Sequence, residues 1–271
     1  MTGSFLDTTI VIHIADQGNP DKAKGEKFVE SNQPAESPYY ALRELLDGHI
    51  HYLCDTHNAI LAADNIAEAL QALLNRSPAE GRKKGAKLQA FATALKSAFT
   101  YNPTGSRGDD QKREMLAALA LRINSIWRSA HRLKNVNLVQ HLGCFNEGKI
   151  AYGAAGELRG PGDSFSCIKS QRCSAAAYLY DNKSDLTKMI EALHPKNLGA
   201  AVAAKNENAK RRKALKELLD KGPKDFDKGR CRALGDAYFA AMCPASSVVV
   251  TSNTVDYMPL CVALSKKAVE T

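Results

Sequence analysis

The segment CRALGDAYFAAMCPASSVVVTSNTVDYMPLCVAL, residues 231–264, predicts a helix, a buried strand and a second helix in succession. Residues 247–251 form a β-branched run that is long enough for one buried strand. Asp236 interrupts the apolar helix before this strand, and Asn253 and Asp256 follow the strand. A carboxylate on a buried helix face is costly unless a cation neutralises it. The segment therefore indicates a cation site that needs further carboxylates from elsewhere in the chain.

Two acidic residues near the N-terminus stand in similarly apolar surroundings. The run FLDTTIVI, residues 5–12, is typical of a central strand, and we expect this strand over residues 4–14, with Asp7 as its only acid. The segment SPYYALRELLDG, which starts at Ser37, predicts a helix with Ser37 as its N-cap and Pro38 in its first turn. Glu44 lies among the apolar positions of that helix.

The motifs FLDTTIVI, LREL, LGDAYFAA and VVVTSNTVDY resemble those of the PIN-domain nuclease family, which includes the VapC-type toxins. The resemblance covers residues 4–50 and 228–268. It implies a three-layer α/β/α fold with a central parallel sheet. It also implies a group of acids at the C-terminal edge of the sheet, which hold Mg²⁺ or Mn²⁺ for phosphodiester cleavage.

The resemblance assigns roles to particular residues. Many members of the family have aspartate where Asn253 stands, so Asn253 or the nearby Asp256 is expected to complete the site. We expect Thr8, Thr251 and Ser252 to hydrogen-bond a ligand or phosphate. The expected catalytic residues are Asp7, Glu44, Asp236, Asn253 and Asp256, and the expected metal ligands among them are Asp7, Glu44, Asp236 and Asp256. The alternative is that Asp7 and Asp256 are caps at strand ends, while Glu44 and Asp236 pair with arginines near in sequence, namely Arg43, Arg230 and Arg232.

Charge is unevenly distributed along the 271 residues, which carry a net charge of +8. Residues 1–60 hold four basic and nine acidic residues, whereas residues 205–232 hold eleven basic and five acidic ones. A nuclease needs carboxylates for cations and basic side chains for phosphates. The residues expected to bind the substrate backbone are Arg82, Lys83, Lys84, Lys210, Arg211 and Arg212. The alternative is that these basic helices are solvated surfaces.

The middle of the chain exceeds what a minimal PIN domain needs. We expect a discontinuous PIN-like domain from residues 1–75 and 225–271, interrupted by a mainly helical, basic insertion at 76–224. Residues 109–133 predict an amphipathic helix within it. Six glycines break the helical period over residues 136–180, which predicts a small subdomain of strands or loops.

A zinc site is a second hypothesis for that glycine-rich stretch. His141, Cys144, Cys167 and Cys173 are four residues able to bind Zn²⁺ in a region with few helices. The spacing between the last two cysteines is wider than is usual for zinc sites. The alternative is that the cysteines are buried, reduced thiols.

The remaining patterns favour a cytoplasmic protein that does not enter the membrane. The start of the chain lacks the pattern of a signal peptide, no apolar run is long enough to span a membrane, and the odd number of cysteines, seven, fits a reducing compartment. We hypothesise a metal-dependent endonuclease acting on RNA rather than DNA, as a toxin or defence enzyme. An antitoxin protein and a second copy of the chain are candidate partners. The alternative function is a catalytically inactive PIN-like module that binds nucleic acid or protein.

Overall fold

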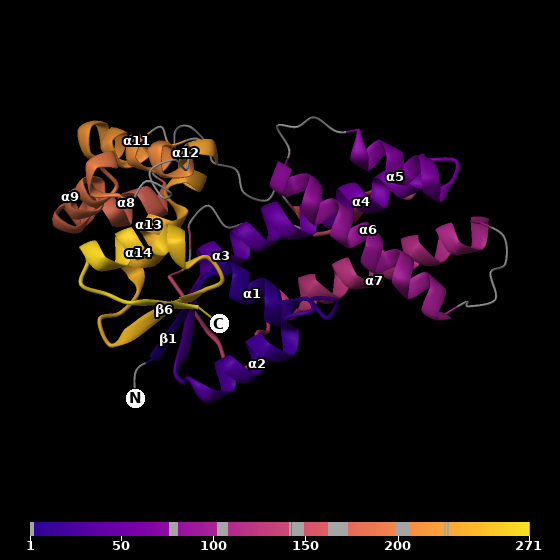
Figure 1. Cartoon of the computed structure of the whole chain (residues 1–271), viewed down its shortest axis with the longest axis horizontal. Coiled ribbons are helices and arrows are strands. Elements are labelled where there is room, and N and C mark those ends of the chain that lie inside the picture. The colour runs from indigo at the N-terminus through magenta and orange to yellow at the C-terminus, as the bar shows by residue number, and fades with distance from the viewer. Residues whose placement is uncertain are drawn as a thin grey trace.

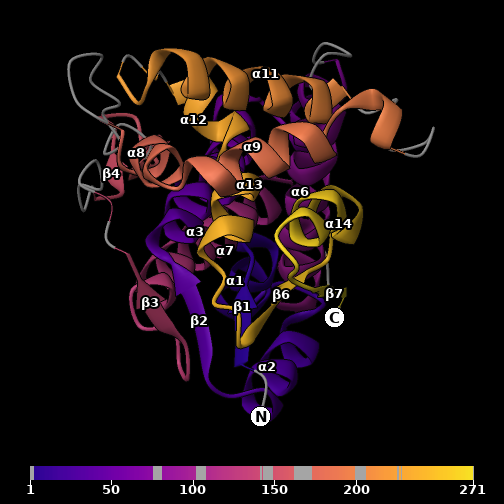
Figure 2. The same cartoon turned by 90° about the vertical axis from the view of Figure 1, so that its left-hand side faces the viewer.

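The computed structural model describes residues 3–75, 81–101, 108–140, 142, 149–161, 173–198, 206–224, 226 and 228–270. Five short parallel strands form its central sheet, in the order β3–β2–β1–β6–β7 (Figure 2). Parallel strands need crossover connections, which place helices on the faces of the sheet. The strands are β1 (Gly3–Leu6), β2 (Ala35–Pro38), β3 (Asn137–Val139), β6 (Ser247–Thr251) and β7 (Ala268–Glu270).

Helices lie on both faces of this sheet. Helices α1 (Thr8–Ala15) and α2 (Lys22–Ser31) lie on one side, whereas α13 (Gly235–Met242) and α14 (Thr254–Ala263) lie on the other (Figure 1). The predicted three-layer α/β/α fold with a central parallel sheet is confirmed. The strand predicted at residues 247–251 is β6.

The two central strands form the middle of the core because helices cover both of their faces. Phe5, Leu6, Val249 and Val250 are at most 1% exposed. The ring of Phe5 packs edge-on against that of Phe239 in α13, with 6.4 Å between the ring centroids. The ends of these two buried strands therefore provide a rigid base for side chains beyond them.

The first strand is shorter than predicted. β1 ends at Leu6, and the carboxylate of Asp7 accepts a hydrogen bond from the backbone N–H of Thr8 at 2.6 Å, which caps α1. The prediction of a strand over residues 4–14 was therefore wrong after Leu6. Ile10 and Val11 are fully buried in α1, and this burial outweighs the small helix penalty of β-branched residues.

The second strand was not predicted, and it changes the start of the following helix. β2 contains the predicted N-cap, Ser37, whose hydroxyl instead donates to the carbonyl of Leu6 at 2.9 Å. Helix α3 (Tyr39–Glu44) begins after Pro38. Its last residue, Glu44, leads into a π-helical turn, η1 (Leu45–Ile50).

The chain between β2 and β3 extends into a helical arm, defined here as α4 to α7. These helices pack on one another and project away from the sheet (Figure 1). Asp16, just after α1, anchors the arm: it accepts two hydrogen bonds from Arg122 of α7, at 2.8 and 2.7 Å, and contacts His49 at 2.7 Å. The helices of the arm are α4 (His51–Ala62), α5 (Ile66–Leu74), α6 (Gly81–Tyr101) and α7 (Gly108–Ala130), the last being the helix predicted at 109–133.

A second group of helices lies between β3 and β6 in the sequence. In space these helices lie beyond the C-terminal ends of the strands (Figures 1 and 2). The insertion is mainly helical as expected, although its residues 137–139 form β3 of the central sheet. The elements are the hairpin β4 (Ala151–Tyr152) and β5 (Leu158–Arg159), α8 (Ser174–Asp181), α9 (Lys183–Ala192), the 3₁₀ turn η4 (Pro195–Asn197), α11 (Asn206–Lys221) and α12 (Lys228–Ala233).

None of the helices in the described parts of the chain has the length and apolar character needed to cross a bilayer.

Candidate functional site

Asp7 is the most firmly held of the predicted acids. It is 4% exposed and stands at the C-terminal end of β1. Besides its bond from Thr8, one carboxylate oxygen accepts from the hydroxyl of Tyr257 at 2.7 Å. The other oxygen accepts from Thr251 at 2.8 Å and from Thr9 at 3.0 Å. These four bonds fill the usual acceptor capacity of a carboxylate, so Asp7 has a fixed orientation.

Glu44 approaches Asp7 from the end of α3. The hydroxyl of Thr8 donates to its carboxylate, and the backbone N–H of Thr8 donates to Asp7, so one residue connects both acids. Glu44 also lies against the start of α13. A Cβ atom at Gly235 would be 2.8 Å from Oε1 of Glu44 and 3.1 Å from the ring of Tyr40. Glycine at this position therefore allows α13 to approach α3 closely.

Asp236 follows that glycine and lies in the first turn of α13. Its carboxylate accepts a hydrogen bond from the guanidinium of Arg211 in α11. Arg211 is 6% exposed, and its Nη1 also donates to Oδ1 of Asn208 at 2.6 Å. The third predicted acid is thus neutralised by an arginine that lies 25 residues earlier in the sequence.

Burial and the charges of neighbouring acids shift the pKa values of Asp7 and Glu44. Burial, followed by the charge of Asp236, raises the pKa of Asp7. The same two causes, with a smaller contribution from Asp7, raise the pKa of Glu44 to about 8. Burial and then the charges of Asp7, Asp236 and Glu44 raise the pKa of Tyr257 well above its usual value. Removing acids from water and placing them together disfavours their charged forms, so this group favours a proton or a cation.

Asn253 and Asp256 lie beside this group at the start of α14. The side-chain amide of Asn253 donates to Asp256, which is 3% exposed. The backbone N–H of Asn253 donates to the hydroxyl of Thr251 at 2.9 Å, and Thr251 in turn donates to Asp7. The fourth position is therefore connected to Asp7 through Thr251. Which of the two residues would bind a cation stays a prediction.

The alternative of caps and arginine pairs holds in part: Asp7 caps α1 at the end of β1, and Asp236 pairs with an arginine other than the three expected. Arg230 pairs with Glu217 at 3.4 Å, and Arg232 donates to Asp47 at 3.1 Å. Arg211 pairs with Asp236.

The basic run at residues 210–212 does not form one continuous surface. Neighbouring residues of a helix point in directions about 100° apart. Lys210 is exposed, Arg211 turns inward to Asp236, and Nε of Arg212 donates to the carbonyl of Ile190 at 3.3 Å. The other expected substrate-binding run, Arg82, Lys83 and Lys84, lies in α6, but its side chains are outside the described residues.

Most of the predicted zinc site also falls outside the described residues, namely His141, Cys144 and Cys167. Cys173 is described and buried, and its Sγ lies 3.6 Å from Sγ of Cys231.

Carboxylate oxygens are the ligands that Mg²⁺ and Mn²⁺ prefer, so the donor atoms of Asp7, Glu44 and Asp236 suit these ions. Over the described ranges, however, no three Asp, Glu, His or Cys side chains are arranged to hold a metal ion together. Five hydrogen bonds already occupy these carboxylates: Arg211 donates to Asp236, and four donors surround Asp7. Direct binding of a cation would require one of the donors to Asp7 and the guanidinium to move.

Comparison with known families, curated proteins and solved structures finds no significant match to this chain.

Sequence reasoning missed two residues at this site. Tyr257 looks like an ordinary core aromatic in an apolar helix, yet its hydroxyl binds Asp7. Thr9 donates to Asp7 and accepts from the backbone N–H of Ser252 at 3.2 Å. The only signal for Thr9 was its place in the DTT sequence beside the first acid.

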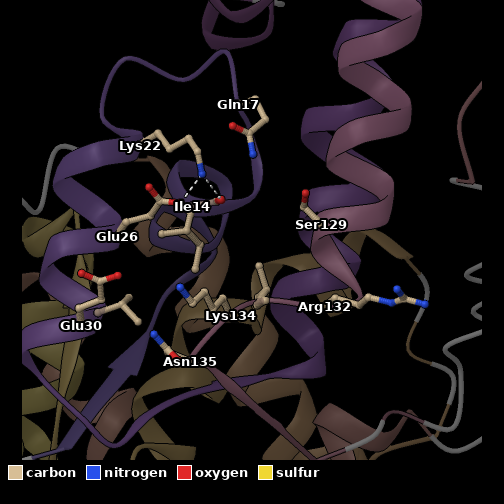
Figure 3. Close-up of a pocket in the computed structure, with 11 residues that line it drawn as sticks. Ile14, Gln17, Lys22, Glu26, Glu30, Ser129, Arg132, Lys134 and Asn135 are labelled. Atoms are coloured by element: carbon tan, nitrogen blue, oxygen red, sulfur yellow. Dashed lines mark hydrogen bonds and ion pairs between the residues drawn. The ribbon is translucent and has the colours of Figure 1, made fainter.

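A separate pocket of about 300 Å³ lies between α2 and the C-terminal end of α7 (Figure 3). Asn135 and Glu30, which line it, come shortly before β3 and β2, so it lies near the N-terminal edge of the sheet, opposite the acids. Its charges are partly neutralised, since Lys22 pairs with Glu26 and donates to the carbonyl of Ile14 at 3.3 Å. This pocket is therefore independent of the acid site.

Proposed function

We propose that the chain is a metal-dependent endonuclease of the PIN type. The observation that supports this proposal most is that Asp7, Glu44 and Asp236 lie near enough to one another for their charges to interact. They come from the ends of β1 and α3 and from the start of α13, and the pKa values of Asp7 and Glu44 are raised by burial and by the charges of neighbouring acids. A group of this kind is the electrostatic requirement of a divalent-cation site. RNA is the proposed substrate, as the family resemblance implies.

Each side chain of the site has a proposed task. Asp7, Glu44 and Asp236 would hold Mg²⁺ or Mn²⁺, and Asn253 or Asp256 would complete the set. Such a cation, when bound, lowers the pKa of a coordinated water and stabilises negative charge on a phosphate. Thr8 fixes Asp7 and Glu44 relative to each other through its two hydrogen bonds.

The test is cleavage of labelled single-stranded RNA, structured RNA and single-stranded DNA, with Mn²⁺, with Mg²⁺ or with EDTA. We expect cleavage of RNA with either metal and none with EDTA. Asp7→Asn and Asp236→Asn should each reduce the rate at least about 100-fold, because each removes charge that the cation needs.

Asp110→Asn is the matched control. Asp110 is an acid in α7 that pairs with Arg113 at 2.7 Å on the surface of the arm. This variant should cleave at the wild-type rate. If Asp7→Asn or Asp236→Asn cleaves as fast as the control, the assignment of the site is wrong.

The Arg211–Asp236 pair favours a second candidate function, a catalytically inactive PIN-like module that binds nucleic acid or protein. In such a module the guanidinium would permanently occupy the place of the cation. Binding of Mn²⁺, measured by calorimetry, separates the two candidates. An enzyme should bind the ion and lose this binding in Asp236→Asn, whereas the inactive module should bind none.

A further inference from the structure

A groove of about 210 Å³ lies between α1 and the helical arm. One wall comes from α1 and the loop that follows it, and the other comes from η1, α4, α6 and α7. In Figure 1 these elements lie together where the arm joins the α/β core. The polar side chains that line the groove include Thr9, His13, His49, Tyr52, Gln89 and Arg122.

The groove begins one hydrogen bond away from the candidate active site. Thr9 and Ser252 line its end. The hydroxyl of Thr9 donates to Asp7 at 3.0 Å and accepts from the backbone N–H of Ser252 at 3.2 Å. His13, one helical turn further along α1, continues the same wall. A polymer with one phosphate at Asp7 would therefore place a neighbouring unit in this groove.

The groove has the chemistry of a nucleobase site. No carboxylate belongs to its described lining. The lining residues do contact three acids. Asp16 is fully buried and engaged by Arg122 and His49, Asp7 accepts from Thr9 at 3.0 Å, and Asp21 lies 3.9 Å from His13. Tyr52 offers an aromatic ring for stacking, while Gln89 and Asn19 offer amides able to bind the edge of a base.

The size of the groove favours a single base over a duplex. Pockets for drug-sized ligands occupy about 300–1,000 Å³, and this groove is smaller. Proteins that recognise single strands take up unstacked bases in such places, by stacking on aromatic rings and hydrogen-bonding the base edges.

We propose that this groove binds one unstacked nucleobase of a single-stranded substrate, next to the phosphate that lies at Asp7. The proposal rests on the proposed nuclease function, because that function places a phosphodiester beside Asp7. In this proposal the helical arm forms the second wall of a base-binding site.

The test uses an eight-nucleotide RNA in EDTA, so that binding is measured without cleavage. One base at a time is replaced by an abasic ribose, and the dissociation constant is measured for each RNA by fluorescence anisotropy. We expect one position at which loss of the base weakens binding about 5- to 100-fold, as expected for a stacked base. Loss of the base elsewhere should change binding less than about threefold.

The variants Tyr52→Ala and Gln89→Ala should reduce this positional effect. Gln71→Ala is the matched control, since Gln71 is an exposed glutamine in α5 that does not line the groove. Gln89 is also exposed, so its variant should fold; thermal unfolding checks both variants. The proposal is overturned if no position stands out, if the RNA does not bind, or if the positional effect persists in both groove variants.

The failure of this proposal can be distinguished from the failure of the nuclease proposal. A protein that cleaves RNA with Mn²⁺ but shows no preferred base position refutes the groove alone. A protein that shows the preferred position in EDTA but never cleaves refutes the nuclease and supports the groove as a binding site.

Discussion

The guanidinium of Arg211 in α11 donates to the carboxylate of Asp236 in α13, one of the three acids proposed to bind a cation. Arg211 is 6% exposed and Asn208 fixes its other end. Asp236 itself is only partly buried, with 26% of its side chain exposed. The proposed cation and this guanidinium would therefore compete for one acid.

Arg211→Ala should make the protein less stable and increase its affinity for Mn²⁺. We expect a loss of about 1–3 kcal/mol in the free energy of unfolding in EDTA, because Asp236 loses its partner while its side chain stays partly solvated. Adding Mn²⁺ should raise the melting temperature of this variant more than that of the wild type. Arg212→Ala, which removes a bond to a backbone carbonyl, is the control. Equal Mn²⁺ effects in both variants would contradict the competition.

Glu44→Gln should change how stability depends on pH. The pKa of Glu44 is raised to about 8, first by burial and then by the charge of Asp236. The unfolded chain releases this proton near pH 4.5, before the folded chain does, so stability should fall as pH rises from about 4.5 to 8. Urea unfolding in EDTA should show the wild type less stable at pH 8.5 than at pH 5.5, by on the order of 1–3 kcal/mol.

In Glu44→Gln this pH difference should shrink, and the variant should be more stable than the wild type at pH 8.5. Asp7 contributes in the same direction, because its pKa is also raised, so the pH difference does not vanish. An unchanged difference between pH 5.5 and pH 8.5 in the variant would show that Glu44 does not retain a proton in this group.

Asp16→Asn should loosen the attachment of the helical arm. Although burial opposes its charge, hydrogen bonds from His49 and Arg122 hold the pKa of Asp16 below its usual value. Removing the charge leaves Arg122 in a mostly buried position without its carboxylate partner, and we expect a loss of about 2–4 kcal/mol in stability. Urea unfolding measures the loss, with Asp21→Asn, an exposed acid 3.9 Å from His13, as the control. Equal stability of the two variants would refute this role.

Gly235→Ala should be unfavourable because α3 and α13 touch at this glycine. The added Cβ would lie 2.8 Å from Glu44 and 3.1 Å from Tyr40. We expect a loss of about 1–3 kcal/mol in stability. Gly85→Ala in α6 is the control, since no atom lies within 4 Å of its Cβ position, and it should stabilise the protein by about 0.5–1 kcal/mol. Thermal unfolding compares the two; a stable Gly235→Ala protein would mean that the helices can separate at little cost.

The sequence predicted those parts of the fold that have a local pattern. Residues 247–251 are β-branched and form β6, and the amphipathic pattern at 109–133 corresponds to α7. β2 could not be predicted because AESP lacks an apolar run and ends in proline. The sequence TTIVI, residues 8–12, fits a strand or a buried helix equally well. Asp7 caps the N-terminus of α1 in the structure, and this cap favours the helix.

The sequence draws attention to the acids of the candidate site but not to the side chains that contact them. Asp7, Glu44 and Asp236 each stand out as charges in apolar stretches, and in the structure Thr8 connects Asp7 with Glu44, while Glu44 lies against Gly235, the neighbour of Asp236. Their role as metal ligands stays a prediction. The pairing of Arg211 with Asp236 depends on how α11 packs against α13, and a basic run gives no sign of which residue turns inward. The hydrogen bond from the hydroxyl of Tyr257 to Asp7 could not be predicted either, because Tyr257 looks like an ordinary aromatic residue of a core helix.

The helical arm leaves the sheet after β2 and returns at β3, and these two strands pair directly, with Pro38 opposite Val139. The two ends of the segment that forms the arm are thus neighbours in the sheet. Lengthening a segment whose ends are held together costs little conformational entropy. Related chains could carry longer, shorter or differently shaped arms on an unaltered sheet. In the proposed nuclease, a changed arm would alter one wall of the groove, and with it the choice of substrate, while the strand ends that carry the acids stay the same.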